Sequence, residues 1–533
     1  MHPRMRGVLL LIAMVAVLLG LWANVAQAQT SPPPCGGKVA SGASAGDPCG
    51  DVTGSSADIG VDPATPTSDA AGKNKIAINF AWTLVTGFLV MFMQAGFALV
   101  ETGFCRKKNA AHVMMTNFMI YGIGILGFWI AGYALMFGGV GHIANLGGTN
   151  PLTGELHIGG WGIFGTKGFA FNGIYDVGVA AHWLFNLVFM DTAATIVTGA
   201  MAERWKWSAF VVYGFWMSII IYPIFGNWAW GGGWLAQLGS KASLGHGYVD
   251  FAGSGVVHAI GGFTGLAGAM VIGPRIGKYN KDGSANVLKA HNIPMAILGC
   301  FILAFGWFGF NPGSTLAATD LRISVVALNT MLASASGSFF AMLWVMNRAP
   351  FKKPDPGMCV NGMLAGLVAI TAPSGFVAPW AALLIGAVAG VLVIESVLFI
   401  DKRGVDDPVG AVSVHGVCGL WGLIGLGLFA DGTYGAGWNG VDGTVKGLFY
   451  GDAGQLVAEV IGCAVIVAWA WGGGYLFFKA QDKLMGIRSK PEDELAGLDL
   501  PEMGAPAYVD VDDSVPASAS SAAGDGSLTP SPA

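Results

Sequence analysis

Charged side chains are scarce in this sequence. Only 11% of its 533 residues are Asp, Glu, Lys or Arg, whereas soluble domains carry about 25%. So little charge excludes a large water-facing surface. The net charge of -5 says little by itself, and no nucleic-acid partner is expected. Hydrophobic residues make up 53% of the chain and the mean hydropathy is +0.59. Repeated apolar runs of membrane-spanning length predict an all-α polytopic protein in a lipid bilayer.

Cysteine is also sparse, with seven residues, no CxxC pair and no cluster of metal-ligand type. The sequence therefore predicts no metal site, and we also expect no cofactor and no enzyme activity. Cys35 and Cys49 lie in an exported stretch, where an oxidising compartment permits a bridge, but their spacing cannot establish one. The other five lie in or beside apolar segments, where cysteine packs as a small apolar side chain.

The first 28 residues have the form of a secretory signal peptide. Arg4 and Arg6 precede an apolar core, and Ala26-Gln27-Ala28 provides a small-x-small cleavage site. The alternative is an uncleaved first transmembrane helix. We expect an exported flexible extension at 29–75, a transmembrane domain at 76–480, and a cytoplasmic regulatory and disordered tail at 481–533.

Eleven hydrophobic segments follow the extension, and the eighth is short and broken by Pro373 and Gly375. If the mature N-terminus is outside, 18 basic residues face the cytoplasm and 7 face outward. This bias agrees with the positive-inside rule and predicts an N-out, C-in topology in the cell inner membrane. The predicted segments start near Ile76, Met114, Val179, Ala209, Phe251, Ile293, Ile323, Cys359, Phe376, Ala411 and Val457.

Two of these segments repeat one pattern in opposite orientations. Asp250 precedes His258 by eight residues, and Asp407 precedes His415 by eight. Eight helical residues rise about 12 Å, which brings each histidine near the midplane of a hydrocarbon core about 30 Å thick. Such a repeat predicts an inverted-repeat transporter with its site at the repeat interface. The alternatives are hydrogen-bonded core histidines and helix-capping aspartates.

Six motifs in order give the sequence a specific resemblance. They are "MQAGFALVETGFCRKKN", "GAMAERWKW", "WAWGGGWLA", "DFAGSGVVH", "GWFGFNPGS" and "DDPVGAVSVHGVCG". Together they resemble the Amt/Mep/Rh ammonium transporter family, in its bacterial Amt branch. The resemblance implies eleven transmembrane helices in inverted five-helix repeats around a central pore in each subunit of a homotrimer.

The resemblance also implies site residues. Phe185, Phe189 and Phe310 match the aromatic positions of the outer site and gate, and Trp230 matches the cation-binding tryptophan. Ser314 matches the hydroxyl that completes the site, and Asp250 the aspartate that shapes it. His258 and His415 match the twin pore histidines. Aromatic rings attract a small cation by about 0.5–2 kcal/mol, and two imidazoles sharing a proton suit a proton relay.

These residues predict an ammonium transporter that recruits ammonium, deprotonates it and conducts ammonia past the histidines. Potassium carries no proton to lose, so a pore that conducts only the neutral molecule rejects it. The segment 485–508 resembles a regulatory tail that binds a PII-type signalling protein, and the alternative is an uninvolved solvated tail. The alternative functions are an ammonium sensor on the same scaffold, a gas channel of the Rh type, and a haem-binding membrane cytochrome.

Overall fold

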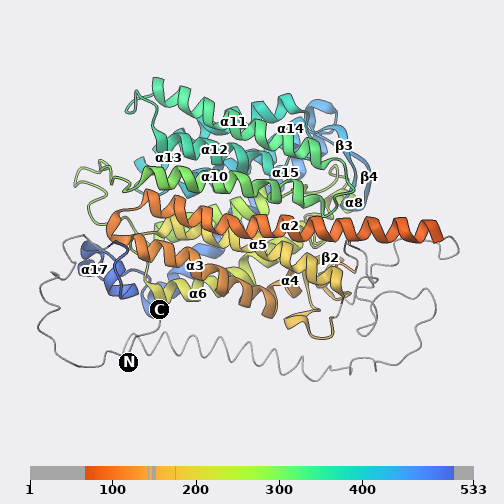
Figure 1. Ribbon diagram of the computed structural model, residues 1–533, viewed down its shortest axis with the longest axis horizontal. Helices are drawn as coiled ribbons and strands as arrows, with labels where there is room; N and C mark the ends of the chain where they lie inside the picture. Colours follow the sequence, from red (N-terminus) through yellow and green to blue (C-terminus); the bar gives the residue numbers. More distant parts are fainter. Residues whose placement is uncertain (1–65, 142, 144, 147–151, 175, 509–533) are drawn as a thin grey trace, which may run out of the picture.

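The computed structural model describes residues 66–141, 143, 145–146, 152–174 and 176–508. The predicted signal peptide, most of the predicted extension, the Cys35–Cys49 pair and residues 509–533 lie outside the described residues. The elongated body in Figure 1 consists of helices that run along its long axis.

Within the described residues, ten helices are long and apolar enough to cross a membrane, and one shorter apolar helix, α12, accompanies them. The number eleven remains a prediction, and α12 is the expected short eighth segment. The helices of the first half are α2 (Pro66–Phe104), α3 (Ala110–Gly127) with η3 (Phe128–Gly132) and α4 (Tyr133–Phe137), α5 (Val177–Met201), α6 (Trp207–Trp216) with η5 (Met217–Ile221) and α7 (Tyr222–Ala229), and η6 (Ser254–Ala259) with α9 (Ile260–Ile272).

The second half continues the same pattern. Its helices are α10 (Ile293–Phe310), α11 (Ile323–Asn347), α12 (Pro356–Thr371), α13 (Pro379–Lys402), η8 (Val412–Val417) with α14 (Cys418–Phe429), and α15 (Ala453–Ile466) with η10 (Val467–Gly472) and α16 (Gly473–Met485). α2 begins ten residues before the predicted segment start at Ile76. Its first turns therefore fall inside the stretch that composition marks as flexible.

Two β-hairpins lie at one end of the bundle, which we call the hairpin end (Figure 1, right). β1 (Glu155–Ile158) pairs with β2 (Trp161–Gly165), and β3 (Asp431–Trp438) pairs with β4 (Val441–Lys446), both antiparallel. The short helices η4 (Phe169–Phe171), α8 (Leu238–Ala242), η7 (Pro312–Thr315) and η9 (Leu448–Tyr450) lie in connections between the spans.

Small residues let the spans approach closely. A Cβ at Gly96 of α2 would lie 2.8 Å from Cγ of Leu303 on α10, and one at Gly299 would lie 2.6 Å from the Gly96 carbonyl oxygen. Such backbone approach is how helices associate in lipid, where no hydrophobic force drives them together. Large apolar side chains such as Phe88, Phe301 and Phe339 are instead exposed on the outside of the bundle, as a lipid-facing surface requires.

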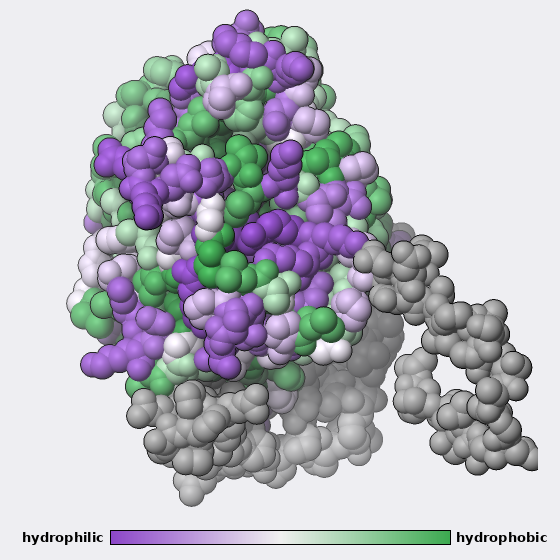
Figure 2. Space-filling view, turned by 90° about the vertical axis from the view of Figure 1, so that its left-hand side faces the viewer, coloured by the Kyte–Doolittle hydropathy of each residue, from purple (hydrophilic) through white to green (hydrophobic). Residues whose placement is uncertain are grey.

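The opposite end of the bundle, which we call the α17 end, is polar. Its face gathers hydrophilic side chains (Figure 2), and η2 (Lys107–Asn109), α17 (Pro491–Ala496) and η11 (Asp499–Met503) lie there. The segment after α16 packs back onto loops between the spans. Lys108 Nζ donates to the Glu494 carbonyl at 2.8 Å, and the His112 amide donates to Asp499 Oδ1 at 2.9 Å.

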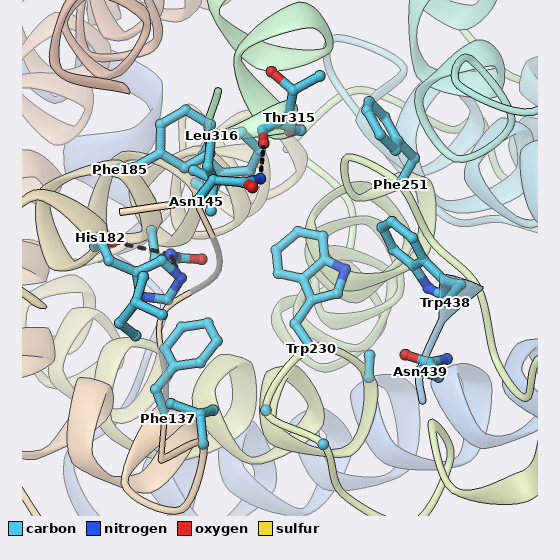
Figure 3. A pocket seen from close by; sticks show the side chains of 18 of the residues that line it. Phe137, Asn145, His182, Phe185, Trp230, Phe251, Thr315, Leu316, Trp438 and Asn439 are labelled. Atoms are coloured by element: carbon cyan, nitrogen blue, oxygen red, sulfur yellow. Dashed lines mark hydrogen bonds between the residues drawn. The ribbon is translucent and has the colours of Figure 1, made fainter. Parts of the chain in front are cut away.

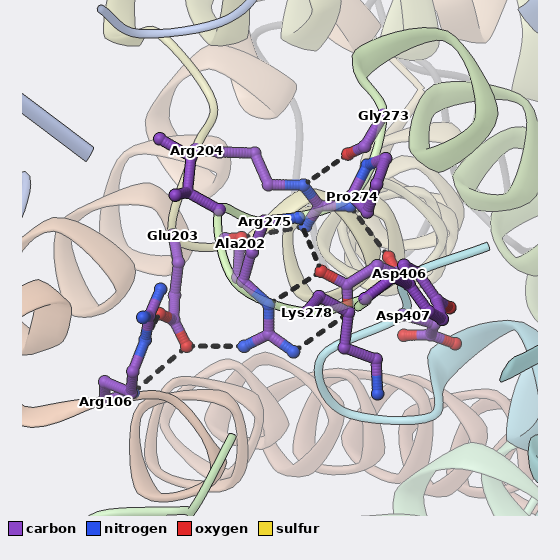
Figure 4. Close-up of polar contacts among 12 residues, drawn as sticks. Arg106, Ala202, Glu203, Arg204, Gly273, Pro274, Arg275, Lys278, Asp406 and Asp407 are labelled. Carbon is purple, nitrogen blue, oxygen red and sulfur yellow. Dashed lines mark hydrogen bonds and ion pairs between the residues drawn. The ribbon is translucent and has the colours of Figure 1, made fainter. Parts of the chain in front are cut away.

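A buried charge network joins four loops at the α17 end (Figure 4). Arg275 contacts Glu203 at 2.7 Å and Asp406 at 2.8 Å, and Arg106 pairs with the same Glu203. Burial alone would raise the pKa of Asp406, but hydrogen bonds from Arg275 and the charge of Arg204 outweigh it and hold that pKa below its ordinary value. The network therefore fixes the loops that follow α2, α5 and α9 against the loop that precedes η8.

Candidate functional site

A cavity of about 510 Å³ opens at the hairpin end, and we call it the vestibule (Figure 3). Four predicted site residues line it: Phe185, Phe189, Trp230 and Ser314. Trp230 follows the last residue of α7, and its ring nitrogen donates to the Asp250 carbonyl at 2.7 Å. This bond holds the indole in the cavity wall with its polar edge satisfied and its π-face available to a cation.

Three phenylalanines close the floor of the vestibule. Phe185 and Phe189 lie one turn apart on α5, and their ring centroids are 4.7 Å apart. Phe310, the last residue of α10, stacks on Phe189 at 4.1 Å with an interplanar angle of 28°. Phe189 and Phe310 are almost fully buried, with exposures of 1% and 0%. The rings therefore separate the vestibule from everything beneath them.

Ser314 lies in η7, directly after α10. Its hydroxyl donates to the Phe310 carbonyl at 2.7 Å. That bond uses the only hydroxyl proton and leaves the oxygen lone pairs to accept a hydrogen bond. The site therefore offers an acceptor that suits an N–H donor in the vestibule.

Asp250 does not line the vestibule, and it acts on the backbone instead. Its Oδ1 accepts the amides of Gly253 and Ser254, and its Oδ2 accepts those of Gly255 and Val256, at 2.8–2.9 Å. This is the helix cap that the sequence allows as an alternative. Asp250 thus shapes the site by fixing the start of η6.

The twin histidines meet beneath the phenylalanines. His258 in η6 and His415 in η8 approach through their Nδ1 atoms at 3.2 Å, and both rings are buried. A contact between two ring nitrogens needs one donor and one acceptor, so the pair holds a single shared proton. The His258 ring stacks on Phe310 at 5.2 Å, which continues the column of rings below the floor.

This contact distance bears on the haem alternative. Metal–nitrogen bonds to histidine are about 2.0–2.1 Å long, so an ion held between two histidines needs a separation of about 4 Å. The Nδ1–Nδ1 distance of 3.2 Å leaves no room for iron between the rings. Within the described residues, no three His, Cys, Asp or Glu side chains form a group that could hold a metal ion.

The expectation of continuous α-helix from each aspartate to its histidine is wrong in detail. Residues 251–253 precede η6 and are not helical, and both histidines lie in π-helical turns. In each copy a glycine three residues after the aspartate has positive φ: Gly253 at 114° and Gly410 at 81°. Each amide donates to its aspartate. This Asp-x-x-Gly pattern is visible in the sequence and was missed.

Other residues at the site were also missed. Glu155, His182, Trp438 and Asn439 line the vestibule. His182 lies on α5, and the other three lie in the two hairpins, where the residue pattern gave no signal for them. Asp191 was not missed: it stands two residues after Phe189, about 200° around a helix, which predicts an interhelical contact away from the pore, and it lies against Gly124 of α3. Its carboxylate is buried and has no hydrogen-bond partner among the described residues.

Comparison with known proteins agrees with this arrangement. Residues 81–508 match the Ammonium Transporter Family. Ammonium transporter Amt2 of Archaeoglobus fulgidus is 48% identical over 440 residues, which cover 81% of this chain and 89% of that protein. Ammonium transporter 1 member 3 of Solanum lycopersicum is 33% identical and covers 81% of this chain and 93% of its own.

Solved structures share the fold. A structure named "Sensor Amt Protein" has a TM-score of 0.71 at 37% identity and covers 80% of this chain and 99% of its own. Mep2 of Candida albicans has a TM-score of 0.66 at 26% identity, over 78% of this chain and 87% of its own. The haem-cytochrome alternative finds no support in these matches, and the chain belongs to the ammonium transporter family.

Proposed function

We propose that this protein transports ammonium by binding it in the vestibule, removing a proton and passing ammonia between the histidines. The observation that carries the proposal is the His258–His415 contact of 3.2 Å directly beneath the stacked rings of Phe189 and Phe310. Trp230 and Phe185 attract the cation, and Ser314 accepts one of its N–H groups. The two phenylalanine rings swing aside to admit the substrate.

The protein selects ammonium over potassium because only the neutral molecule, ammonia, crosses the pore. Moving a bare cation into a low-dielectric passage costs tens of kcal/mol in the Born limit, whereas ammonia avoids most of this cost. Potassium cannot lose a proton, so it stays in the vestibule. The shared proton of the histidine pair leaves one acceptor and one donor edge for ammonia as it passes.

The proposal also covers the orientation of the protein in the membrane, its internal repeats, its assembly and its partner. The hairpin end faces outward and the α17 end faces the cytoplasm of a cell whose inner membrane holds the protein. Two inverted five-helix repeats place the histidine pair at their interface, and three copies form a homotrimer. A PII-type signalling protein binds at the α17 end, where the chain from Lys490 onward packs against the loops.

Single alanine substitutions of His258 and His415 test the mechanism. In proteoliposomes, the wild type gives ammonium-evoked current and methylammonium uptake but no potassium current. Each variant loses the ammonium current or admits potassium. Wild-type current, uptake and selectivity in both variants would refute the relay.

An ammonium sensor is a second candidate, because one similar structure is named "Sensor Amt Protein". A sensor binds ammonium in the vestibule without conducting it. Calorimetric binding of ammonium by purified protein, together with no flux in proteoliposomes of the same preparation, would favour the sensor over the transporter.

A further inference from the structure

A second cavity lies on the far side of the histidine pair from the vestibule. Its volume is about 20 Å³, and its walls include Phe97, Glu101, Asn361 and His415. To hold a water molecule, a cavity needs a volume of about 10–15 Å³ and two to four polar partners. This cavity therefore suits one water between the imidazole of His415 and the carboxylate of Glu101.

Glu101 lies one turn after Phe97 on α2, and the Phe97 ring packs on His415 at 5.8 Å. The carboxylate is 2% exposed. Its Oε2 accepts hydrogen bonds from Asn117 Nδ2 at 2.7 Å and from Thr198 Oγ at 2.8 Å. Both partners are neutral, and Glu101 forms no ion pair among the described residues.

This setting differs from that of the other buried acids near the α17 end. Glu203 and Asp406 each form an ion pair with Arg275. Glu101 accepts its side-chain hydrogen bonds only from neutral donors among the described residues. An acid held in this way can take up a proton and give it back, because no cation locks it in the charged form.

We infer that Glu101 is the proton acceptor on the α17 side of the histidine pair, an inference that rests on the proposed function. The N–H bond of the protonated histidine pair breaks and its proton passes to the cavity water. A proton of that water forms an O–H bond with the Glu101 carboxylate. Ammonia that has passed the histidines then takes this proton, so ammonium and the carboxylate form again and the charge balances.

Glu101→Gln tests the role, because glutamine keeps a carbonyl oxygen for Asn117 and Thr198 but carries no exchangeable acid. We expect the ammonium-evoked current to fall about 100-fold, the lower end of the range for loss of a positioned acid–base group. Ammonia permeation stays close to wild type; it is measured by stopped flow as the rise in internal pH when vesicles meet an inward ammonia gradient at equal pH on both sides. Glu101→Asp keeps an acid and recovers part of the current.

Glu395→Gln is the matched control, since Glu395 pairs with Arg348 at 2.7 Å, away from the cavity; its current stays at the wild-type value. If Glu101→Gln carries the wild-type ammonium current while His258→Ala carries none, this inference is overturned and the proposed function stands. Equal loss of current and ammonia permeation in both Glu101 variants would also overturn it, because the role would then be packing. A silent wild type would overturn the proposed function itself.

Discussion

The four amide bonds to Asp250 make a quantitative prediction for Asp250→Asn. An asparagine retains one acceptor oxygen, so two of the four bonds from Gly253, Ser254, Gly255 and Val256 are lost, and its NH₂ group faces two amide donors. Hydrogen bonds to a charged group contribute about 1.5–3 kcal/mol each, so the loss is about 3–6 kcal/mol at the start of η6.

That loss acts directly on the relay, because η6 carries His258. The Asp250 carbonyl also accepts the hydrogen bond from the Trp230 indole. The indole in the vestibule and the imidazole of His258 therefore shift together. A misplacement of about 1 Å at a reacting group costs about 100-fold in rate. We therefore expect ammonium-evoked current in proteoliposomes to fall about 100-fold, with a lower thermal unfolding temperature.

Asp407→Asn serves as the comparison. Asp407 accepts amide bonds from Gly410 at 3.1 Å and Val412 at 2.7 Å and is only partly buried, so its replacement lowers the current and the unfolding temperature less. Wild-type current in Asp250→Asn, or greater damage from Asp407→Asn, would refute the capping argument.

Three further predictions concern the charge network and the vestibule. Arg275→Met leaves Asp406 buried without its ion-pair partner and removes one of the two arginines that pair with Glu203, which lowers the free energy of unfolding by about 3–5 kcal/mol in chemical denaturation. Because the pKa of Asp406 lies below its ordinary value, its contribution to stability is complete above about pH 4 and disappears as the pH falls further, so melting temperatures at pH 7 and pH 3 differ less in Asp406→Asn than in the wild type. Trp230→Leu removes a cation–π attraction of about 0.5–2 kcal/mol, which raises the half-saturating ammonium concentration about 2- to 30-fold; an unchanged value would exclude the indole from binding.

The spans and the histidine pair were predictable because each depends on local pattern. Hydropathy and length define a span, and the break before Pro373 predicts the short α12. The repeated eight-residue spacing predicts that His258 and His415 approach the midplane together, and they meet at 3.2 Å. The aromatic residues of the vestibule came from the resemblance, since a buried phenylalanine in a gate has the same pattern as one in a core.

The remaining residues of the site depend on contacts between distant segments. Asn439 reaches the vestibule because its amide donates to the carbonyls of His246 at 2.9 Å and Tyr248 at 2.8 Å, which lie about 190 residues earlier. Glu101 becomes notable only when α2 brings it beneath His415. No periodicity along one segment encodes such pairings, because they arise when the spans pack.

The two glycines of the Asp-x-x-Gly turns, Gly253 and Gly410, allow a test of whether these turns set the positions of the histidines. Gly253 and Gly410 adopt positive φ, where a Cβ costs about 1–2 kcal/mol, and the neighbours add to this cost. An added Cβ at Gly253 would lie 2.6 Å from Val257 Cγ2, and one at Gly410 would lie 2.7 Å from Asn361 Nδ2. Gly404 has a similar φ of 77° but nothing within 4 Å of its Cβ position.

Alanine at Gly253 or Gly410 therefore strains the turn that precedes a histidine and crowds a neighbouring side chain, whereas alanine at Gly404 strains only its own loop. We expect both motif variants to lose most of the ammonium current and Gly404→Ala to retain it, at equal amounts of reconstituted protein. If Gly253→Ala and Gly404→Ala conduct equally well, the capped turns do not set the positions of the histidines. The eight-residue spacing would then have brought His258 and His415 together through packing of the spans alone.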